Sequence, residues 1–254
     1  LGEGRTQTRE AGEELASRHE EIGDWLRQLS NETILDAYRD KSNLMYDIPS
    51  VVYDGVLMPP GPRSVSAKPL LVGANRDEQK LFQIYDPSLV RWIGTKAKII
   101  DPGRYEAFNR YYSDWLNFDG VDRVANMATG PVYAYRFDWD DLGATPDRDW
   151  PQIMGAAHGL EIPFVFGNFR MGLFQGELFD VSNIEARIEL SASIRSYWTQ
   201  FARTGNPGRG RAGDLPSWEL WNGERKLVFD TKPDGGVRME SAAIDIGSVH
   251  RSLW

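Results

Sequence analysis

Three short apolar runs along the chain have the length of β-strands and are bounded by turn-forming or charged residues. They cover residues 69–74 (PLLVGA), 132–137 (VYAYRF) and 226–229 (KLVF). A continuous run such as LLVGA, without alternation of polar and apolar positions, is typical of a strand that is buried on both faces of a parallel sheet. We therefore predict that these three segments are strands.

Helical periodicity fills most of the sequence between these runs. The predicted helices cover residues 5–29, 31–38, 87–127 and 185–203. Ser30 or Asn31 caps the second helix, and Gly205 with Pro207 ends the last one. The inward faces are expected to carry Tyr105, Phe108, Tyr112, Trp115 and Leu116 in the third helix and Ile188, Ser191, Ile194, Tyr197, Trp198 and Phe201 in the fourth. Strands that alternate with helices predict an α/β fold, with a mostly parallel sheet flanked by helices on both faces.

Charged side chains follow the first predicted strand. Asp77 and Glu78 come directly after it, and His158 comes after the second strand. In open parallel sheets, functional residues lie on the loops at the carboxyl ends of the strands. We therefore expect the two carboxylates and the histidine at the same edge of the sheet.

Composition excludes several classes of protein. The 254 residues include no cysteine, which excludes disulfide scaffolds, thiolate zinc sites and a cysteine nucleophile. The formal net charge of −8 is spread along the chain and does not favour a nucleic-acid partner. No apolar run approaches the 18 or so residues that a membrane span requires. A chain of this length can bury a core without a metal or a disulfide.

Three histidines occur in the chain. His19 in a Glu-rich segment and His250 near the end are expected to be solvated, whereas His158 lies between Gly155 and Gly159. Glycines allow a ligand or a neighbouring loop to approach the backbone closely. From its position alone, His158 is either a functional residue or a hydrogen-bonded histidine in a tight loop.

Metal and nucleotide sites have little support in the sequence. His158 and Glu161 lack the two-histidine spacing of a zinc protease helix, and Pro163 argues against a helix there. There is no glycine-rich phosphate loop, so we expect no cofactor. The order of acid and then histidine is that of an α/β-hydrolase triad, whose serine comes first in the chain. The chain contains no Gly-x-Ser-x-Gly elbow, and a histidine and a carboxylate without a serine cannot form an acyl-enzyme.

Four longer segments of the chain are distinctive in combination. They are residues 71–78 (LVGANRDE), 132–137 (VYAYRF), 155–167 (GAAHGLEIPFVFG) and 197–207 (YWTQFARTGNP), with a turn at residues 53–55 (YDG) upstream. In this order they resemble the type-B carboxylesterase (cholinesterase-like) family. The resemblance covers nearly the whole chain but only the C-terminal half of the family's usual length. It implies an α/β-hydrolase fold in which residues 1–254 are the C-terminal portion of a single catalytic domain.

The resemblance also implies roles for individual residues. His158 would be the general base, and Glu78 would be the carboxylate that orients it. Asp77 would be structural, paired with an arginine, and Glu161 would brace the histidine loop. Leu81 and Phe82 fall where the family places side chains near the acyl pocket, so they would bind substrate.

Two features depart from the family pattern. Gln79 stands where the family usually has glycine after the Asp-Glu pair, which would tighten or shift the acid loop. The family often closes a small disulfide loop in the region that matches residues 13–27, and this chain has no cysteine to form it. Neither departure removes the acid or the base.

Three hypotheses follow from the resemblance. The favoured one is a serine carboxylic-ester hydrolase in which this chain supplies Glu78 and His158, while the N-terminal half, on a missing or separate chain, supplies the serine. Its substrate would be a small uncharged ester. The alternatives are a non-catalytic adhesion module of cholinesterase-like fold and a fragment without function of its own. Retention of both Glu78 and His158 favours the enzyme.

Overall fold

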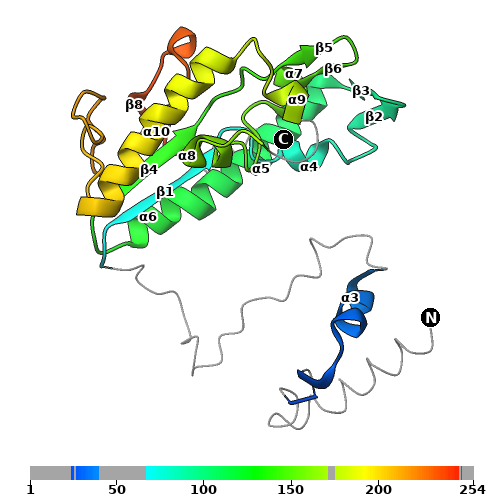
Figure 1. Cartoon of the computed structure of the whole chain (residues 1–254), viewed down its shortest axis with the longest axis horizontal. Helices are drawn as coiled ribbons and strands as arrows, with labels where there is room; N and C mark the ends of the chain where they lie inside the picture. Colours follow the sequence, from blue (N-terminus) through cyan, green and yellow to red (C-terminus); the bar gives the residue numbers. More distant parts are fainter. Residues whose placement is uncertain (1–23, 26, 40–66, 171–174, 246, 248–254) are drawn as a thin grey trace. The chain divides into compact units, whose positions relative to one another are not determined.

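The computed structural model describes residues 24–25, 27–39, 67–170, 175–245 and 247 (Figure 1). The contacts within the chain divide it into two units, Leu1–Pro62 and Arg63–Trp254. Most of the predicted helix over residues 5–29 lies outside the described residues, as does the turn at residues 53–55.

A short helix is the main described element of the first unit. Helix α3 spans Asn31–Arg39, close to the predicted bounds. Ser30 caps it, because its hydroxyl oxygen accepts a hydrogen bond from the backbone N–H of Thr33 at 3.1 Å.

The second unit is built on a four-stranded, mostly parallel sheet. In spatial order its strands are β1 (Leu70–Asn75), β4 (Val132–Phe137), β7 (Arg225–Phe229) and β8 (Arg238–Ser241). The first three run parallel, with Leu71 beside Tyr133 and Tyr135 beside Leu227, whereas β8 is antiparallel to β7. The three predicted strands are confirmed, and β8 is an additional strand that the apolar pattern did not indicate.

The other elements of this unit are helices and two small hairpins. In chain order they are α4 (Lys80–Gln83), β2 (Val90–Ile93), β3 (Lys96–Ile99), α5 (Pro102–Asn117), the π-helical turn η1 (Phe118–Asp122), α6 (Arg123–Met127), β5 (Ala144–Thr145), β6 (Arg148–Asp149), α7 (Trp150–Met154), α8 (Ile162–Phe166), α9 (Gln175–Leu178), α10 (Ile184–Thr204) and the 3₁₀ turn η2 (Lys232–Asp234).

Helices cover both faces of the sheet, as predicted (Figure 1). On one face α10 packs against β4, where the rings of Tyr135 and Trp198 lie 5.2 Å apart. On the other face lie α5, η1 and α6, and the fully buried Lys226 of β7 reaches Asp122 of η1 at 2.6 Å. Helix α10 ends where the sequence predicts, because Gly205 adopts a left-handed conformation with a φ of 74°.

The predicted long helix over residues 87–127 is wrong in its first part. Residues 90–99 form the β2–β3 hairpin, in which Gly94 takes a positive φ of 62° at the turn, and the helix begins only at Pro102. Asp101 caps it by accepting a hydrogen bond from the backbone N–H of Arg104. An apolar pattern in a short segment fits a hairpin as well as a helix, and the cap decides where the helix starts.

The predicted inward face of α5 is correct only in part: Tyr105 is buried and Phe108 packs against the hydrophobic core, as predicted. Tyr112, Trp115 and Leu116 are exposed within the described part of the chain. The buried face is instead a stripe at intervals of four residues, formed by Tyr105, Asn109, Ser113 and Asn117. The side chains of Asn109, Ser113 and Asn117 are buried because they bind the loop that follows β1, as described below.

Two smaller expectations on the remaining helices need correction. Ile188 of α10 is exposed, although Ile194 and Tyr197 of the same predicted face are buried. Pro163 does not prevent a helix, since α8 begins at Ile162 and proline is tolerated in the first turn.

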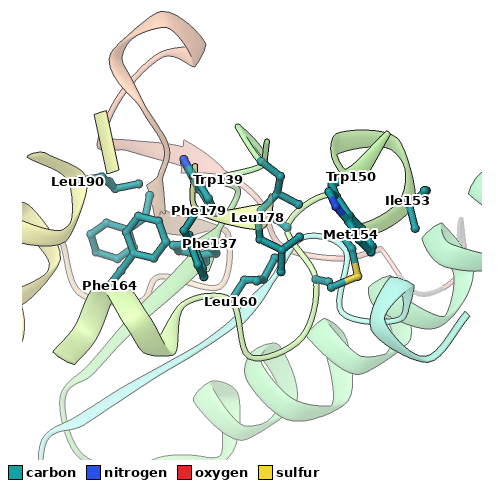
Figure 2. Close-up of a cluster of buried hydrophobic side chains, with 14 of the residues drawn as sticks. Phe137, Trp139, Trp150, Ile153, Met154, Leu160, Phe164, Leu178, Phe179 and Leu190 are labelled. Atoms are coloured by element: carbon teal, nitrogen blue, oxygen red, sulfur yellow. The ribbon is translucent and has the colours of Figure 1, made fainter. Parts of the chain in front are cut away.

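The hydrophobic core of this unit lies beneath the carboxyl end of β4. Phe137 at the end of β4, Trp139 just beyond it and Phe164 of α8 are fully buried, and the rings of Trp139 and Phe164 lie 4.8 Å apart (Figure 2). Met154 and Leu160, on either side of His158 in the sequence, belong to the same core. The loop that carries His158 therefore rests on tightly packed side chains.

Gly73 of β1 provides a test of this packing. A Cβ atom at position 73 would overlap the ring of Tyr135, which is itself packed against Trp198 and Phe229. We expect Gly73→Ala to lower the free energy of unfolding by roughly 1–3 kcal/mol, as other overpacking substitutions do. Thermal unfolding followed by circular dichroism would measure the loss. Gly120→Ala is the matched control, because a Cβ at that exposed position meets nothing within 4 Å. Equal unfolding midpoints for the two variants would contradict this account.

Candidate active site

The acid loop, residues 75–80, connects β1 to α4 and positions Glu78. The backbone N–H of Asn75 donates to Oε1 of Glu78 at 2.8 Å, which leaves Oε2 directed elsewhere. The backbone N–H of Gln79 donates to the hydroxyl of Ser113 on α5 at 3.0 Å. Asn117, one turn further along α5, donates to the carbonyl of Asn75 at 3.0 Å. Both ends of the loop are therefore fixed to the sheet and to α5.

The histidine turn, residues 155–161, connects α7 to α8 and lies against the acid loop. The backbone N–H of Asp77 donates to the carbonyl of Ala156 at 3.0 Å, and the N–H of Ala156 donates to a carboxylate oxygen of Asp77 at 3.0 Å. Gly155 takes a φ of 50°, and a Cβ at this position would overlap the Asp77 carboxylate. Glycine is therefore needed both for the backbone conformation and for the close approach.

These contacts bring Glu78 and His158 together. Oε2 of Glu78 lies 2.6 Å from Nδ1 of His158. The glutamate side chain is 12% exposed, whereas the histidine side chain is 57% exposed. A carboxylate accepts and does not donate, so the proton of the neutral imidazole is on Nδ1 and Nε2 keeps its lone pair. The arrangement can accept a proton at Nε2 and stabilise the resulting imidazolium.

The electrostatics of the site favour protonation of His158. The hydrogen bond that His158 donates to Glu78 raises the pKa of His158 above its ordinary value, whereas partial burial lowers this pKa. The charges of Glu78 and Glu161 raise this pKa further. Such a histidine is a stronger base than a solvated one.

Asp77 is the charged centre of the contact between the two loops. Burial would raise the pKa of its carboxyl, but Arg76, Lys80 and the N–H of Ala156 outweigh this effect and hold the pKa below its usual value. The guanidinium of Arg76 lies 2.9 Å from the carboxylate of Asp77, and the amide of Asn109 on α5 donates to the same carboxylate at 2.7 Å. Asp77 is thus paired with an arginine, as expected, and its oxygens are occupied by structural bonds.

The expected substrate-binding residues lie on α4, which follows the acid loop. Phe82 is half-buried, and its ring centroid lies 5.5 Å from that of His158. Leu81 is half-buried and packs against the hydrophobic core. The structure therefore brings Phe82 to the histidine and places Leu81 on the same short helix.

Comparison with known proteins relates this geometry to a family. The carboxylesterase family model matches residues 91–245, which is more than half of the chain. The chain belongs to the carboxylesterase family. The resemblance read from the sequence is thereby confirmed.

Several curated relatives align with most of this carboxylesterase chain. A para-nitrobenzyl esterase of Bacillus subtilis is 29% identical over 238 residues, covering 82% of this chain and 46% of that protein. The human cocaine esterase is 28% identical and covers 84% of this chain and 45% of that protein. A zebrafish (Danio rerio) acetylcholinesterase is 36% identical over 139 residues, 51% of this chain and 20% of that protein. The chain thus spans about half the length, or less, of these relatives.

Solved structures support the predicted fold class. A carboxylesterase from Geobacillus stearothermophilus matches with a TM-score of 0.59 and 23% identity, covering 91% of this chain and 50% of that chain. At this level of identity the match shows the fold alone. The mostly parallel sheet flanked by helices is that of an α/β-hydrolase, as predicted.

The departure from the family at Gln79 causes no backbone strain. Its φ of −74° and ψ of −23° are right-handed helical values that any residue adopts. The predicted tightening of the acid loop is therefore not required by the conformation of Gln79, which occupies the N-cap position of α4 without a capping bond from its side chain.

Sequence reasoning missed several polar residues of the site. Asn75 was read only as part of a motif, yet its side chain donates to the carbonyl of Ala157 and to the carboxylate of Glu161. Asn109, Ser113 and Asn117 were also missed. Their signal is a stripe of amide and hydroxyl side chains at intervals of four residues on an otherwise aromatic helix.

The remaining candidates are the other two histidines, a metal site and a membrane span. His19 and His250 lie outside the described residues. Among the residues that the structure describes, no three histidine or carboxylate side chains are arranged to hold a metal ion. Within the same part of the chain, no helix is long and apolar enough to cross a membrane.

The bond between Glu78 and His158 predicts a change in titration. We expect Glu78→Gln to lower the pKa of His158, because the amide keeps a hydrogen-bonding oxygen but loses the charge. When the pKa of a histidine is higher in the folded than in the unfolded state, its protonation adds to the free energy of unfolding at pH values below the unfolded-state pKa. This contribution is lost as the pH rises through the folded-state pKa. NMR titration of the His158 ring would measure the shift. Glu219→Gln, which removes an exposed carboxylate paired with Arg225, is the control. An unchanged His158 titration in Glu78→Gln would contradict the assignment.

Proposed function

We propose that this chain provides the acid and the base of a serine carboxylic-ester hydrolase. The observation that carries the proposal is the 2.6 Å contact between Oε2 of Glu78 and Nδ1 of His158 at the carboxyl edge of a parallel sheet. Membership of the carboxylesterase family supports ester hydrolysis as the reaction. The nucleophilic serine would come from the N-terminal half of the same esterase, which this chain does not contain.

His158 acts at two steps of the proposed reaction. Its Nε2 takes the proton of the serine hydroxyl as the serine oxygen attacks the ester carbonyl carbon. The tetrahedral intermediate collapses when the bond to the alcohol oxygen breaks, and His158 returns the proton to that oxygen. Water then attacks the acyl carbon while Nε2 takes a proton from it, and His158 returns that proton to the serine oxygen as the serine–acyl bond breaks and the carboxylic acid leaves. Every proton transfer uses side chains, and the reaction needs no cofactor.

Glu78 acts through His158 and not on the substrate. Its carboxylate holds Nδ1–H and thereby points Nε2 away from the acid loop. It also stabilises the imidazolium that exists between the two proton transfers. The bond from the N–H of Asn75 to its other oxygen fixes the carboxylate in this orientation.

The shape of the sheet supports a complementary half. Within the described part of the chain, β1 pairs with β4 on one side only and so forms an edge of the sheet. Its residues 70–74 (LLVGA) are all half-exposed. A long apolar edge strand is an aggregation hazard unless another strand covers it. We therefore assign residues 1–254 to the C-terminal portion of one catalytic domain, with a strand of the N-terminal half beside β1.

The surroundings of His158 favour a small uncharged ester. Phe82 lies beside the imidazole of His158. Ile162 of α8, four residues after His158 in the sequence, has an exposed apolar side chain. Ligand sites are mostly apolar with few polar groups. Leu81 and Phe82 would contact the acyl or alcohol part of the substrate.

Substitution of the two residues tests the mechanism in the complete esterase. We expect His158→Ala to lower kcat on the order of 10⁴–10⁶-fold, and Glu78→Gln by a smaller factor of about 10²–10⁴. The kcat/KM of the wild type should fall as the pH drops through the raised pKa of His158, because only the neutral imidazole accepts the serine proton. Hydrolysis of p-nitrophenyl acetate provides the assay, and Glu219→Gln is the control. Wild-type turnover by His158→Ala would exclude the triad, and absence of turnover in all proteins would favour the adhesion module.

The origin of the serine has its own test. We expect the active esterase to contain polypeptide beyond this chain, either as a second chain or as an extension. Mass spectrometry of an intact, active preparation measures this directly. If esterase activity accompanied only a species of 28.8 kDa, the mass of this chain, the serine assignment would be wrong.

A further inference from the structure

Asn75 contacts both the acid and the turn that carries the base. It is the last residue of β1 and is 1% exposed. We propose that Asn75 is a positioning residue, whose side-chain amide locks the histidine turn against the acid loop and so sets the distance between Glu78 and His158. This inference rests on the proposed function.

The side chain of Asn75 makes hydrogen bonds to residues on both sides of His158 in the sequence. Its Nδ2 donates to the carbonyl oxygen of Ala157, directly before His158, at 2.7 Å. The same Nδ2 donates to Oε2 of Glu161, three residues after His158, at 2.6 Å. Its backbone N–H holds Oε1 of Glu78 at 2.8 Å. One residue thus fixes the acid through its backbone and the histidine turn through its side chain.

Asn75 can act as a reference point because its own backbone is held rigidly. It pairs with the fully buried Phe137 in the β1–β4 register, and the next residue, Arg76, donates its N–H to the carbonyl of Phe137 at 2.9 Å. Asn117 of α5 binds its carbonyl oxygen at 3.0 Å. A movement of the histidine turn relative to Asn75 is therefore a movement relative to the whole sheet.

The chemistry of the site requires an amide at this position. Both partners of the side chain are acceptors, so only the NH₂ end of asparagine satisfies them. Among the described residues no donor reaches Oδ1 of Asn75, although it is buried. The amide oxygen is left without a bond so that both donors can be used. An aspartate would present acceptors alone to two acceptors.

Two further groups share this environment and affect its charge. Glu161 raises the pKa of His158, so its orientation by Asn75 bears on the base as well. The phenol of Tyr135 on β4 lies near Glu78 and Glu161; burial, with those two charges, raises its pKa and keeps it neutral. Among the described residues, Glu78 and Glu161 are the charged groups that raise the pKa of His158.

The first test removes the amide in the complete esterase. We expect Asn75→Ala to lower kcat about 10–10²-fold with KM nearly unchanged, since a shift of about 1 Å in a reacting group can cost this much and Asn75 is too buried to meet substrate. A loosened Glu78–His158 bond should also move the acidic limb of the kcat/KM profile to lower pH. A purely structural role predicts a lower unfolding temperature without either change.

Asn183 offers a matched control for loss of stability. It is also buried, and its Nδ2 also donates to two carbonyl oxygens, those of Asp141 and Leu178, at 2.8 and 3.1 Å. We expect Asn183→Ala to lower the unfolding temperature but to leave kcat and the pH profile as in the wild type. If folded Asn75→Ala kept wild-type kcat and pH profile, the proposal would be overturned.

A second test exchanges donor and acceptor and does not depend on Asn75→Ala folding. Asn75→Asp places a carboxylate next to the carboxylate of Glu161. Adding Glu161→Gln restores a hydrogen bond between the two positions, because the amide at position 161 then donates to the carboxylate at position 75. We expect kcat of Asn75→Asp to be at least about tenfold below that of the wild type. The kcat of the double variant should be at least about threefold above that of Asn75→Asp. Recovery should be partial, because the carbonyl of Ala157 still lacks its donor. A double variant no more active than Asn75→Asp would overturn the proposal.

The two proposals fail in different ways. His158→Ala with wild-type turnover would refute the proposed function. Loss of activity in His158→Ala, combined with wild-type kinetics in Asn75→Ala, would leave the function standing and refute only the role of Asn75.

Discussion

The junction between the acid loop and the histidine turn is the constraint on which the rest of the site depends. The two segments are 80 positions apart in the chain, yet Asp77 and Ala156 exchange backbone and carboxylate hydrogen bonds that align them. This requires parallel pairing of β1 with β4, so that both strands end at the same edge of the sheet. It also requires the absence of a side chain at Gly155, because the Asp77 carboxylate fills that space.

The junction is stabilised largely by buried polar groups. Asn109 and Ser113 of α5 and the amide of Asn75 all bind backbone or carboxylate partners in the loops. A buried polar group is costly without a partner, so such a network favours one arrangement over its neighbours more sharply than apolar packing does. The hydrophobic core under β4 supplies the rigid base, and the polar network sets the positions of the loops. This division explains how an exposed histidine can be held accurately.

The proposed acid and base, Glu78 and His158, both lie in the described part of this chain. Glu78 lies on the loop that directly follows β1, whereas His158 lies on the turn between α7 and α8, further along the chain from β4. The proposed nucleophile belongs to the part of the family's length that this chain does not span. In the described part of the chain β1 has a neighbouring strand on one side only, and its residues 70–74 are half-exposed, as the proposed division would leave them.

The sequence by itself determined the three parallel strands, the start of α3, the end of α10 and the placement of Glu78 and His158 at one edge of the sheet. These features depend on signals that lie close together in the sequence: apolar runs, a serine cap, a glycine at the helix end and segments that resemble those of a known family. Only the tertiary structure decided that residues 90–99 form a hairpin, that α5 buries its amides while it exposes Tyr112 and Trp115, and that Asn75 binds the histidine turn. The physical reason is that hydrophobic periodicity predicts burial from the side chain alone, whereas a polar group is buried only when a distant segment supplies its hydrogen-bond partner.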